Sequence, residues 1–460
     1  MKSKGTLKLT AQKIVCAPYG ELMRRFEKWV TAEGALEAAR NTIFTPQTTF
    51  WLFLDQVFTG DGTCREILRK YQAWRAVAGK KEISPNTGGY CQARARLSLG
   101  DIQAVNKQII QRVDGEYPRQ LWCGRSVIVA DGSSISMPDT PGNQERYPQP
   151  TSQKKGCGFP VMRIVVYFAL SSGIILDMAK DALTVGETTL SRRLWDILQE
   201  GDVFLADRGF CSYADVHYMR ERKVDCVLRN HPRRSVGVKP VKQLGDGDRL
   251  VYWTKSKVRP RWLDKEAWNA LPDTMLIREI KVVVVPPGFR TENLTIVTTL
   301  LDPRLFPKEA FAQLYLQRWR AELFLRDIKI SMNMDVLRCK TPDMVNKEVY
   351  MHLIAYNLVR ALMLQAAATK NISPLRISFK GTAVTVRQWA PMMAVAAHYG
   401  SDCAKMYKAL LNAIARDPVP ERQGRAEPRA RKRRPKNYQL LTKPRKEFKE
   451  CPHRSRYVKA

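Results

Sequence analysis

The sequence predicts an α/β fold in which a mixed β-sheet flanked by helices follows a helical region and is interrupted by a mostly β insertion. Three observations predict this fold. Helix signals dominate residues 1–120, short β-branched runs alternate with helical patterns in 121–230, and Pro, Gly and β-branched residues dominate 231–290. With 460 residues, 44% of them hydrophobic, the chain can form more than one domain around a sizeable core.

The helices of the first region are indicated by an apolar run and a capping box. Residues 48–58 are apolar and rich in aromatic side chains, and a Gly-Asp-Gly turn follows at 60–62. Thr63 and Glu66 then form a Ser/Thr-x-x-Glu pattern, which opens a helix. A later helix that starts at Tyr90 carries Gln and Arg side chains, and it either enters a DNA groove or is an ordinary basic surface helix.

The predicted sheet consists of short apolar runs. Two of them end at an aspartate: Ser126–Ala130 precedes Asp131, and Val203–Ala206 precedes Asp207. Further strands are expected at 159–170, 173–179, 224–228 and 294–300, and helices at 186–199, 213–222, 308–330 and 345–368.

The charge of the chain favours a polyanionic partner. Lys and Arg exceed Asp and Glu by 77 − 44 = +33, so nucleic acid is the first candidate and an anionic membrane surface the second. No uncharged apolar run approaches the roughly 18–20 residues of a spanning helix, which disfavours the membrane. Residues 421–460 contribute 15 − 4 = +11, which predicts a largely unstructured basic tail that adds phosphate affinity or solubility.

Cysteine and histidine patterns exclude two classes of site. The ten cysteines form no CxxC pair and the five histidines do not cluster with them, so neither a zinc site nor a disulfide framework is expected. No Gly-x4-Gly-Lys-Ser/Thr loop that would cradle phosphates is present either. The cysteines are expected to be free thiols in a reducing cytoplasm.

The two strand-end aspartates are candidate functional residues. A carboxylate just past a buried strand projects from the carboxyl edge of the sheet, where open α/β sheets place their sites. Gly132 and Gly209 follow Asp131 and Asp207 closely, so little side-chain bulk blocks a ligand. The alternative for each aspartate is that it only forms a turn.

The helix around residue 320 offers a third carboxylate. At 100° per residue, Tyr315, Arg318, Glu322 and Lys329 fall within a stripe about 60° wide. The alternative is a salt-bridged surface face. With three carboxylates and no Cys or His ligands, hard oxygen-binding ions are favoured, meaning Mg²⁺ or Mn²⁺. Two such ions about 4 Å apart can activate a nucleophilic oxygen and stabilise the leaving oxygen of a phosphodiester.

The spacing Tyr-x2-Arg-x3-Glu-x6-Lys resembles the Y-R-E-K signature of a large family of DDE transposases from bacterial insertion sequences, the insertion-sequence-four type. Other segments are similar too: Asp131-Gly132-Ser133, 206–210, 298–302 and 356–360. The resemblance implies an RNase H-like catalytic core that carries a β-rich insertion, here about 231–305. It also implies that Asp131, Asp207 and Glu322 hold two metal ions.

The resemblance implies roles for a tyrosine and for basic side chains as well. Tyr315, Arg318 and Lys329 match residues that contact the DNA backbone near the cleaved end, and Arg208 is a weaker phosphate candidate. Some members cut through a hairpin intermediate in which an insertion-domain Trp stacks on a flipped base. The corresponding position here is Asn293-Leu294, so Trp253, Trp262 or Phe289 would have to substitute.

Together these expectations describe a transposase that cuts at terminal inverted repeats and joins the 3′-hydroxyl ends to target DNA. The resemblance implies a homodimer on double-stranded DNA, in the cytoplasm at the nucleoid. The alternatives are an RNase H-like nuclease and an inactive DNA-binding descendant of a transposase. The expected regions are a DNA-binding domain (1–120), a split core (121–230 and 306–416), the insertion (231–305) and the tail (417–460).

Overall fold

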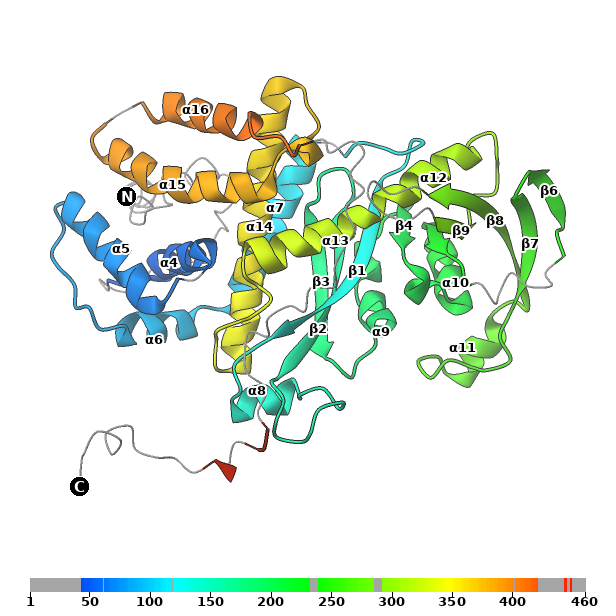
Figure 1. Cartoon of the computed structure of the whole chain (residues 1–460), viewed down its shortest axis with the longest axis horizontal. Coiled ribbons are helices and arrows are strands. Elements are labelled where there is room, and N and C mark those ends of the chain that lie inside the picture. Colours follow the sequence, from blue (N-terminus) through cyan, green and yellow to red (C-terminus); the bar gives the residue numbers. More distant parts are fainter. Residues whose placement is uncertain are drawn as a thin grey trace, which may run out of the picture.

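The computed structural model describes residues 43–60, 62–117, 119–231, 239–284, 292–400, 402–420, 442–444 and 447–448. Predictions made for residues 1–42, for Phe289 and for most of the basic tail lie outside these residues. In the described part, a lobe of helices lies beside a long twisted sheet (Figure 1).

A nine-stranded mixed sheet forms the centre of the molecule, in the order β3-β2-β1-β4-β5-β9-β8-β7-β6 (Figure 1). The strands are β1 (Val127–Ser136), β2 (Val161–Ala169), β3 (Ile175–Ala182), β4 (Val203–Ala206), β5 (Asp225–Arg229), β6 (Lys242–Gly245), β7 (Asp248–Thr254), β8 (Thr274–Val284) and β9 (Glu292–Thr298).

The first five strands form the expected core. Strands β1, β2 and β3 are an antiparallel meander, and β4 and β5 run parallel to β1 on its other side. This order and these directions are those of an RNase H-like core, so the predicted fold class is confirmed. The strands of the insertion continue the same sheet, because β9 pairs with β5 on one edge and with β8 on the other.

Helices cover both faces of this sheet and build the lobe beside it. They are α4 (Pro46–Thr59), α5 (Cys64–Val77), α6 (Gly88–Arg96), α7 (Leu99–Glu116), α8 (Pro141–Arg146), α9 (Glu187–Arg192), α10 (Tyr213–Glu221), α11 (Lys265–Ala270), α12 (Lys308–Gln317), α13 (Trp319–Arg326), α14 (Pro342–Lys370), α15 (Phe379–His398) and α16 (Cys403–Ala415). The predicted capping box opens α5, where the Thr63 hydroxyl accepts a hydrogen bond from the Glu66 N–H at 3.1 Å.

The long helix α14 is the centre of the helical lobe. It is apolar on all sides and buried along most of its length, because α4, α7, α15 and α16 pack around it. None of the helices that the structure describes is long and apolar enough to cross a lipid bilayer.

Neighbouring residues of β2 define the two faces of the sheet. Phe168 points to one face, where its ring lies 5.3 Å from that of Phe324 on α13. Tyr167 points to the other, where its hydroxyl lies 2.7 Å from Ser191 Oγ on α9. We call these the α13 face and the α9 face, because successive side chains of a strand alternate between them.

One predicted helix is shorter in the structure, and one side chain of α6 is buried. The expected helix 186–199 ends at Arg192, and the chain turns so that Trp195 is buried against Tyr218 and Trp262. On α6, Arg94 does not face a solvent groove: it is buried, lies 4.3 Å over the ring of Phe53 and contributes to the packing of α6 on α4. Arg94 therefore does not read DNA in this arrangement.

Candidate functional site

The register of β1 and β4 brings the two predicted aspartates together. These parallel strands pair Val129 with Leu205, and the aspartates lie two residues further along each strand. Two residues on, a side chain returns to the same face of the sheet. Asp131 therefore projects toward the α13 face from the middle of β1, and Asp207 follows directly after the end of the neighbouring strand β4.

Beyond these aspartates one edge of β1 is open. Strand β4 ends at Ala206, whereas β1 continues to Ser136, which pairs with Val336 on the same side. Between the pairing of β1 with β4 and the pairing of Ser136 with Val336, no strand among the described residues covers this edge of β1. Side chains from either face of the sheet can therefore reach it. This opening is the place where a site can form.

Asp131 is half-buried and lies in an acidic position. Its Oδ1 accepts a hydrogen bond from the Gly132 N–H at 2.8 Å. Burial raises the pKa of Asp131 to about 6; the Gly132 N–H and Arg318 lower it, while Glu322 and Glu187 raise it further. Two other carboxylates therefore lie near Asp131, one from each side of the strand.

Asp207 ends β4 and caps the short turn η2 (Arg208–Phe210). Its Oδ1 accepts a hydrogen bond from the Arg208 N–H at 2.6 Å. The Arg208 side chain itself is exposed at the rim of the site. Arg208 is thus available to a phosphate but is not part of the central group.

The helix expected at 308–330 is present, as α12, α13 and a final turn, but it is not regular. It tightens at Arg318, whose N–H bonds the Tyr315 carbonyl three residues back, and widens into a π turn at Asp327–Ser331. The wide turn directs Asp327 toward α14 and Lys329 toward β1. The rotation of 100° per residue that holds for a regular α-helix therefore does not give the directions of side chains in this segment.

The members of the predicted stripe nevertheless lie close together. Arg318 Nη2 donates to Glu322 Oε1 at 3.0 Å, and the Arg318 guanidinium lies 5.9 Å from the ring centre of the buried Tyr315. Burial acts to lower the pKa of Arg318, but Tyr315, Glu322 and Asp131 together raise it. Arg318 therefore lies between the carboxylates of Glu322 and Asp131.

Lys329 connects the end of this helix to β1. Its Nζ donates to Ser133 Oγ at 2.7 Å, although the two residues are 196 positions apart in the sequence. Ser133 projects on the same face of β1 as Asp131. The structure thus places Asp131, Glu322, Arg318 and Lys329 in one group, and Asp207 follows the strand next to β1.

The donor chemistry of this group suits a hard divalent cation. Asp131, Asp207 and Glu322 supply carboxylate oxygens, which Mg²⁺ and Mn²⁺ prefer. Among the described residues, no three Asp, Glu, His or Cys side chains lie close enough to hold an ion as they stand. Each of the three carboxylates instead accepts from a backbone N–H or from Arg318.

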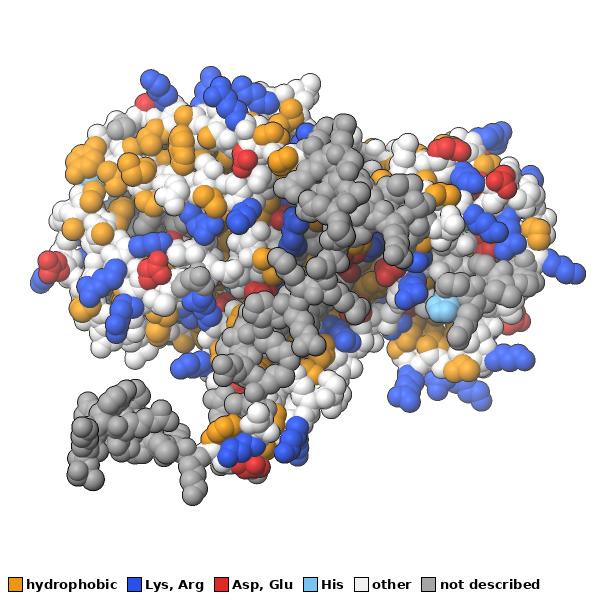
Figure 2. Space-filling view, viewed as in Figure 1, with side chains coloured by type: hydrophobic (Ala, Val, Ile, Leu, Met, Phe, Trp, Pro, Cys, Tyr) orange, Lys and Arg blue, Asp and Glu red, His pale blue; other side chains and the backbone are white. Residues whose placement is uncertain are grey.

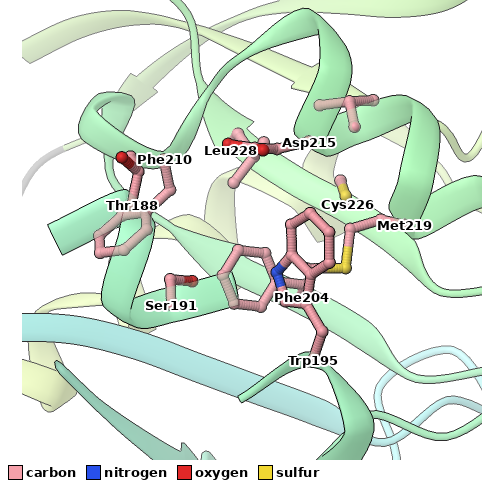
Figure 3. A pocket seen from close by; sticks show the side chains of 10 residues that line it. Thr188, Ser191, Trp195, Phe204, Phe210, Asp215, Met219, Cys226 and Leu228 are labelled. Atoms are coloured by element: carbon pink, nitrogen blue, oxygen red, sulfur yellow. The ribbon is translucent and has the colours of Figure 1, made fainter. Parts of the chain in front are cut away.

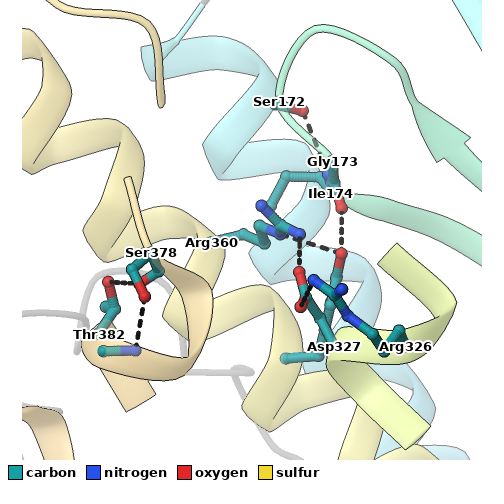
Figure 4. Close-up of polar contacts among 10 residues, drawn as sticks. Ser172, Gly173, Ile174, Arg326, Asp327, Arg360, Ser378 and Thr382 are labelled. Carbon is teal, nitrogen blue, oxygen red and sulfur yellow. Dashed lines mark hydrogen bonds and ion pairs between the residues drawn. The ribbon is translucent and has the colours of Figure 1, made fainter. Parts of the chain in front are cut away.

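A buried ion pair fixes the helix that carries Glu322 and Lys329. Arg360 on α14 donates to Asp327 Oδ2 at 2.7 Å, and only 3% and 12% of the two side chains are exposed (Figure 4). The Arg360 guanidinium also lies 4.7 to 5.2 Å from the ring centres of Phe324, Tyr356 and Phe379. Arg360 therefore holds the π turn two residues before Lys329.

The same segment of α14 holds the β2–β3 turn. Arg360 Nε donates to the Tyr356 hydroxyl, which donates to the Gly173 carbonyl at 2.8 Å. The Asn357 side chain accepts from the Ile175 N–H and donates to the Ile175 carbonyl. The stretch 356–360, noted from the sequence only as a similarity, thus positions the site without entering it.

Sequence reasoning missed Arg360, Asp327 and Glu187. A buried Arg on an apolar helix that lacks a polar face is a signal for a buried partner, and Arg360 meets this description. Glu187 carries no local signal, because the contact it makes depends on how α9 packs under β1.

The aromatic residues considered for base stacking are not free to stack as they lie. Trp253 is 5% exposed, and Trp262 packs against Trp195 and beneath the Arg192 guanidinium at 4.1 Å. Phe289 lies outside the described residues. On β7, Tyr252 is 51% exposed and is the aromatic side chain of that strand that faces solvent.

A small cavity lies on the α9 face, beneath α9 and α10 (Figure 3). It is large enough for about one water molecule. Apolar side chains dominate its lining, and the bidentate pair of Arg192 with Asp215 (2.8 and 3.0 Å) closes it. The cavity reflects packing of the helices on the sheet and is not a substrate site.

Comparison with known proteins gives a family and similar proteins. The family described as "Transposase DDE domain" matches residues 122–358. The chain is 26% identical over 355 residues to the transposase InsG for insertion sequence element IS4 of Escherichia coli (strain K12), across 76% of this chain and 78% of that protein. A cryo-EM structure of a piggyBac transposase synaptic complex with hairpin DNA is similar with a TM-score of 0.42 and 8% identity, over 91% of this chain and 85% of that one.

The raised pKa of Asp131 predicts that this carboxylate costs stability in the ion-free protein. Its folded pKa of about 6 lies above the ordinary 3.8, so the cost is present above pH 6 and disappears as the pH falls below 4. We expect Asp131→Asn to stabilise the protein in EDTA at pH 7.5, by up to about 3 kcal/mol, and by less at pH 5. Thermal unfolding midpoints at the two pH values measure this effect.

Asp181→Asn is the matched control for that measurement. Burial acts to raise the pKa of Asp181, but hydrogen bonds from Arg146, the Ala182 N–H and Arg193 lower it to about 2. This carboxylate therefore stabilises the protein above pH 4, and its replacement should lower the midpoint at pH 7.5. A lower midpoint for Asp131→Asn as well would contradict the interpretation of the site as half-buried and acidic.

The Arg360–Asp327 pair predicts a large loss of stability when one partner is removed. Asp327→Ala leaves a buried guanidinium without its carboxylate and should cost about 3–5 kcal/mol. Replacing both partners with apolar side chains, as in Arg360→Met with Asp327→Leu, should recover most of that loss. Unfolding midpoints in urea test both statements.

The control for this experiment is an exposed pair. Glu200 bonds Lys223 at 2.9 Å with both side chains more than two thirds exposed, so Glu200→Gln should cost about 1 kcal/mol or less. If Asp327→Ala unfolds at the same urea concentration as Glu200→Gln, the buried pair does not hold the helix.

Proposed function

Because this chain belongs to the transposase DDE domain family, we propose that it is a metal-dependent DNA transposase. It cuts DNA at the terminal inverted repeats of an insertion sequence and joins the freed 3′-hydroxyl ends to target DNA. The observation that carries this proposal is the group formed by Asp131 on β1, Asp207 after β4 and Glu322 on α13. It is supported by Arg318, which bonds Glu322 and interacts with Asp131, and by the pairing of β1 with β4, the strand that Asp207 directly follows.

Asp131, Asp207 and Glu322 would hold two Mg²⁺ ions, or Mn²⁺ in their place. Bound there, the ions supply Lewis acidity at the scissile phosphate. The Arg318 side chain neutralises part of the carboxylate charge at the same place.

The cations around this group would orient the DNA. Lys329 lies beside the strand edge through Ser133, and Arg208 lies exposed at its rim. Arg and Lys side chains in such positions bind phosphate oxygens and place the backbone for in-line attack. Arg318 and Tyr315, which are more buried, would contact the backbone closest to the cleaved bond or hold Glu322 for it.

The surface suits a long polyanion. Lys and Arg side chains are spread over the visible face of both the helical lobe and the insertion, and Asp and Glu are fewer there (Figure 2). With a net charge of +33, salt-dependent affinity for DNA follows. We assign recognition of terminal repeats to residues 1–120, added nonspecific affinity to 417–460, and synapsis of two ends to a homodimer acting on DNA in the cytoplasm.

A nicking assay tests this function. The substrate is a duplex that carries the terminal repeat of the element, incubated with the full-length protein and Mg²⁺. Asp131→Asn, Asp207→Asn and Glu322→Gln should each lower the nicking rate at least about a hundredfold, which corresponds to about 2.7 kcal/mol of lost transition-state stabilisation. Glu200→Gln, an exposed carboxylate away from the site, should keep the wild-type rate.

The same reactions separate a transposase from a nuclease. A labelled 3′ end that becomes joined to a target duplex supports the proposal. Nicked ends that are never joined would mean a nuclease, and tight binding without any cut under Mg²⁺ or Mn²⁺ would mean a DNA-binding protein.

Lys329 should contribute to DNA affinity through charge. Lys329→Met removes one phosphate contact, so binding should weaken and the slope of log affinity against log salt should fall by about one. Ser133→Ala removes the hydroxyl that Lys329 bonds but keeps the charge, so the slope should stay unchanged. Fluorescence anisotropy over a salt series measures both, and an unchanged slope for Lys329→Met would remove this residue from the DNA contact.

A further inference from the structure

We propose that Cys64 and Cys91 form a redox-active thiol pair, which hydrogen peroxide oxidises to a disulfide that joins helix α5 to helix α6. Cys64 attacks the peroxide, and Cys91 completes the disulfide. The pair belongs to the helical lobe and includes none of the carboxylates of the candidate site, so this inference does not depend on the proposed function.

The distance between the two sulfur atoms is the first observation. Cys91 Sγ lies 3.8 Å from Cys64 Sγ, although the residues are 27 positions apart in the sequence. Cys64 is the first residue of α5, and Cys91 lies near the start of α6. Since an S–S bond is about 2.05 Å long, the sulfur atoms must come about 1.8 Å closer to form one. Rotation about one Cα–Cβ bond moves a sulfur atom further than this.

Hydrogen-bond donors and a positive charge surround the sulfur of Cys64. Arg94 Nη1 lies 3.5 Å from Cys64 Sγ, and Gln56 Nε2 lies 3.7 Å from it. Cys64 also stands at the N-terminus of α5, directly after the N-cap residue Thr63. A guanidinium and a helix N-terminus both stabilise a thiolate, which is the form of cysteine that attacks an oxidant. Cys64 is therefore placed to react first.

Packing holds the guanidinium of Arg94 beside Cys64. Arg94 is buried, lies 4.3 Å over the ring of Phe53 and donates through Nη2 to Cys339 Sγ at 3.3 Å. Burial acts to lower the pKa of this guanidinium, but Tyr90, Cys339 and Cys64 raise it. The positive charge is thus retained next to the Cys64 sulfur.

Cys91 suits the second step of the reaction. Desolvation and the neighbouring Cys64 raise the pKa of the Cys91 thiol, so it does not compete with Cys64 for the peroxide. Cys91 is exposed on α6, which lets a small thiol reductant reach the finished disulfide and restore the pair. The two cysteines therefore have different surroundings that match different roles.

A cavity beside Cys64 gives a small oxidant room to approach. The cavity has a volume of about 100 Å³, and its lining includes Cys64, Arg94 and His352 on α14. A water molecule needs about 10–15 Å³ measured in the same way, so hydrogen peroxide fits. His352 is buried, and its Nδ1 has no hydrogen-bond partner in the described part of the chain. The lining can therefore hydrogen-bond a peroxide next to the sulfur.

The reaction consumes one hydrogen peroxide and releases two molecules of water. The Cys64 thiolate attacks one peroxide oxygen, the O–O bond breaks, and the leaving hydroxide takes up the proton that the thiol lost. This leaves a sulfenic acid on Cys64. Cys91 Sγ then attacks the Cys64 sulfur, the S–S bond forms, and the sulfenic hydroxyl leaves as water with the Cys91 proton. Two electrons pass from the pair of sulfurs to the peroxide.

Peptide mapping of the full-length protein tests the proposal. The reduced protein is treated with hydrogen peroxide, remaining thiols are blocked with iodoacetamide, and the digest is analysed by mass spectrometry. We expect a linked peptide that contains Cys64 and Cys91 and that a thiol reductant separates. Cys91→Ser should stop at the sulfenic acid of Cys64, which dimedone traps, and Cys64→Ser should give neither product.

Thermal unfolding measures the effect of the disulfide on the helical lobe. The bond closes a loop across 27 positions and so restricts the unfolded chain. Peroxide should therefore raise the unfolding midpoint of the wild type by several degrees and leave that of Cys91→Ser unchanged. Melting curves of the reduced variants check that they are folded.

Cys123 provides the matched control. It is exposed like Cys91, and within the described residues no other thiol contacts it. Cys64 should react with peroxide at least about tenfold faster than Cys123, and Cys123→Ser should form the linked peptide as the wild type does. If no linked peptide forms, or if Cys123 is oxidised as fast as Cys64, the two thiols are only neighbours and the inference is wrong.

Discussion

The arrangement of the site depends on one buried arginine. Arg360 on the central helix α14 pairs with Asp327, packs among three aromatic rings and, through the Tyr356 hydroxyl, reaches the turn between β2 and β3. Three parts of the chain are joined at this residue: the helical lobe, the β-meander and the helix that carries Glu322. A charge this well buried is costly to leave unpaired, so the parts it joins cannot separate without a large loss of free energy.

Strand pairing also determines how the residues of the candidate site are arranged. Strand β1, which carries Asp131, pairs with β4, which Asp207 follows, and the earlier end of β4 leaves an edge that both faces of the sheet can reach. On the α13 face this edge meets Glu322, Arg318 and Lys329, and on the α9 face it meets Glu187. Acidic groups held close together in a half-buried place lower stability, which proteins accept where the groups serve a reaction.

Local patterns were sufficient for some parts of this molecule and insufficient for others. The capping box at Thr63, the strand before Asp207 and the long apolar helix from 342 to 370 follow from residue order, and the structure has them at nearly the expected positions. The strand expected to end at Ala130 continues to Ser136, so Asp131 lies inside it. The helix at 308–330 was expected to be regular, and its π turn was missed. The π turn begins at Asp327, which pairs with Arg360, a contact across 33 positions that no periodicity records.

The sequence by itself determined which chemistry is present: strand-end aspartates, a glutamate among cations, a strongly basic chain and the absence of a Cys or His ligand pattern in the chain as a whole. Residue types and short-range spacing carry that information, because they act through local backbone preference and side-chain chemistry. Only the tertiary structure decided that Lys329 meets Ser133, that Arg360 holds the glutamate helix and that Glu187 lies beneath Gly132. Those contacts join residues that are distant along the chain, so they follow from the packing of helices on a twisted sheet and not from any local pattern.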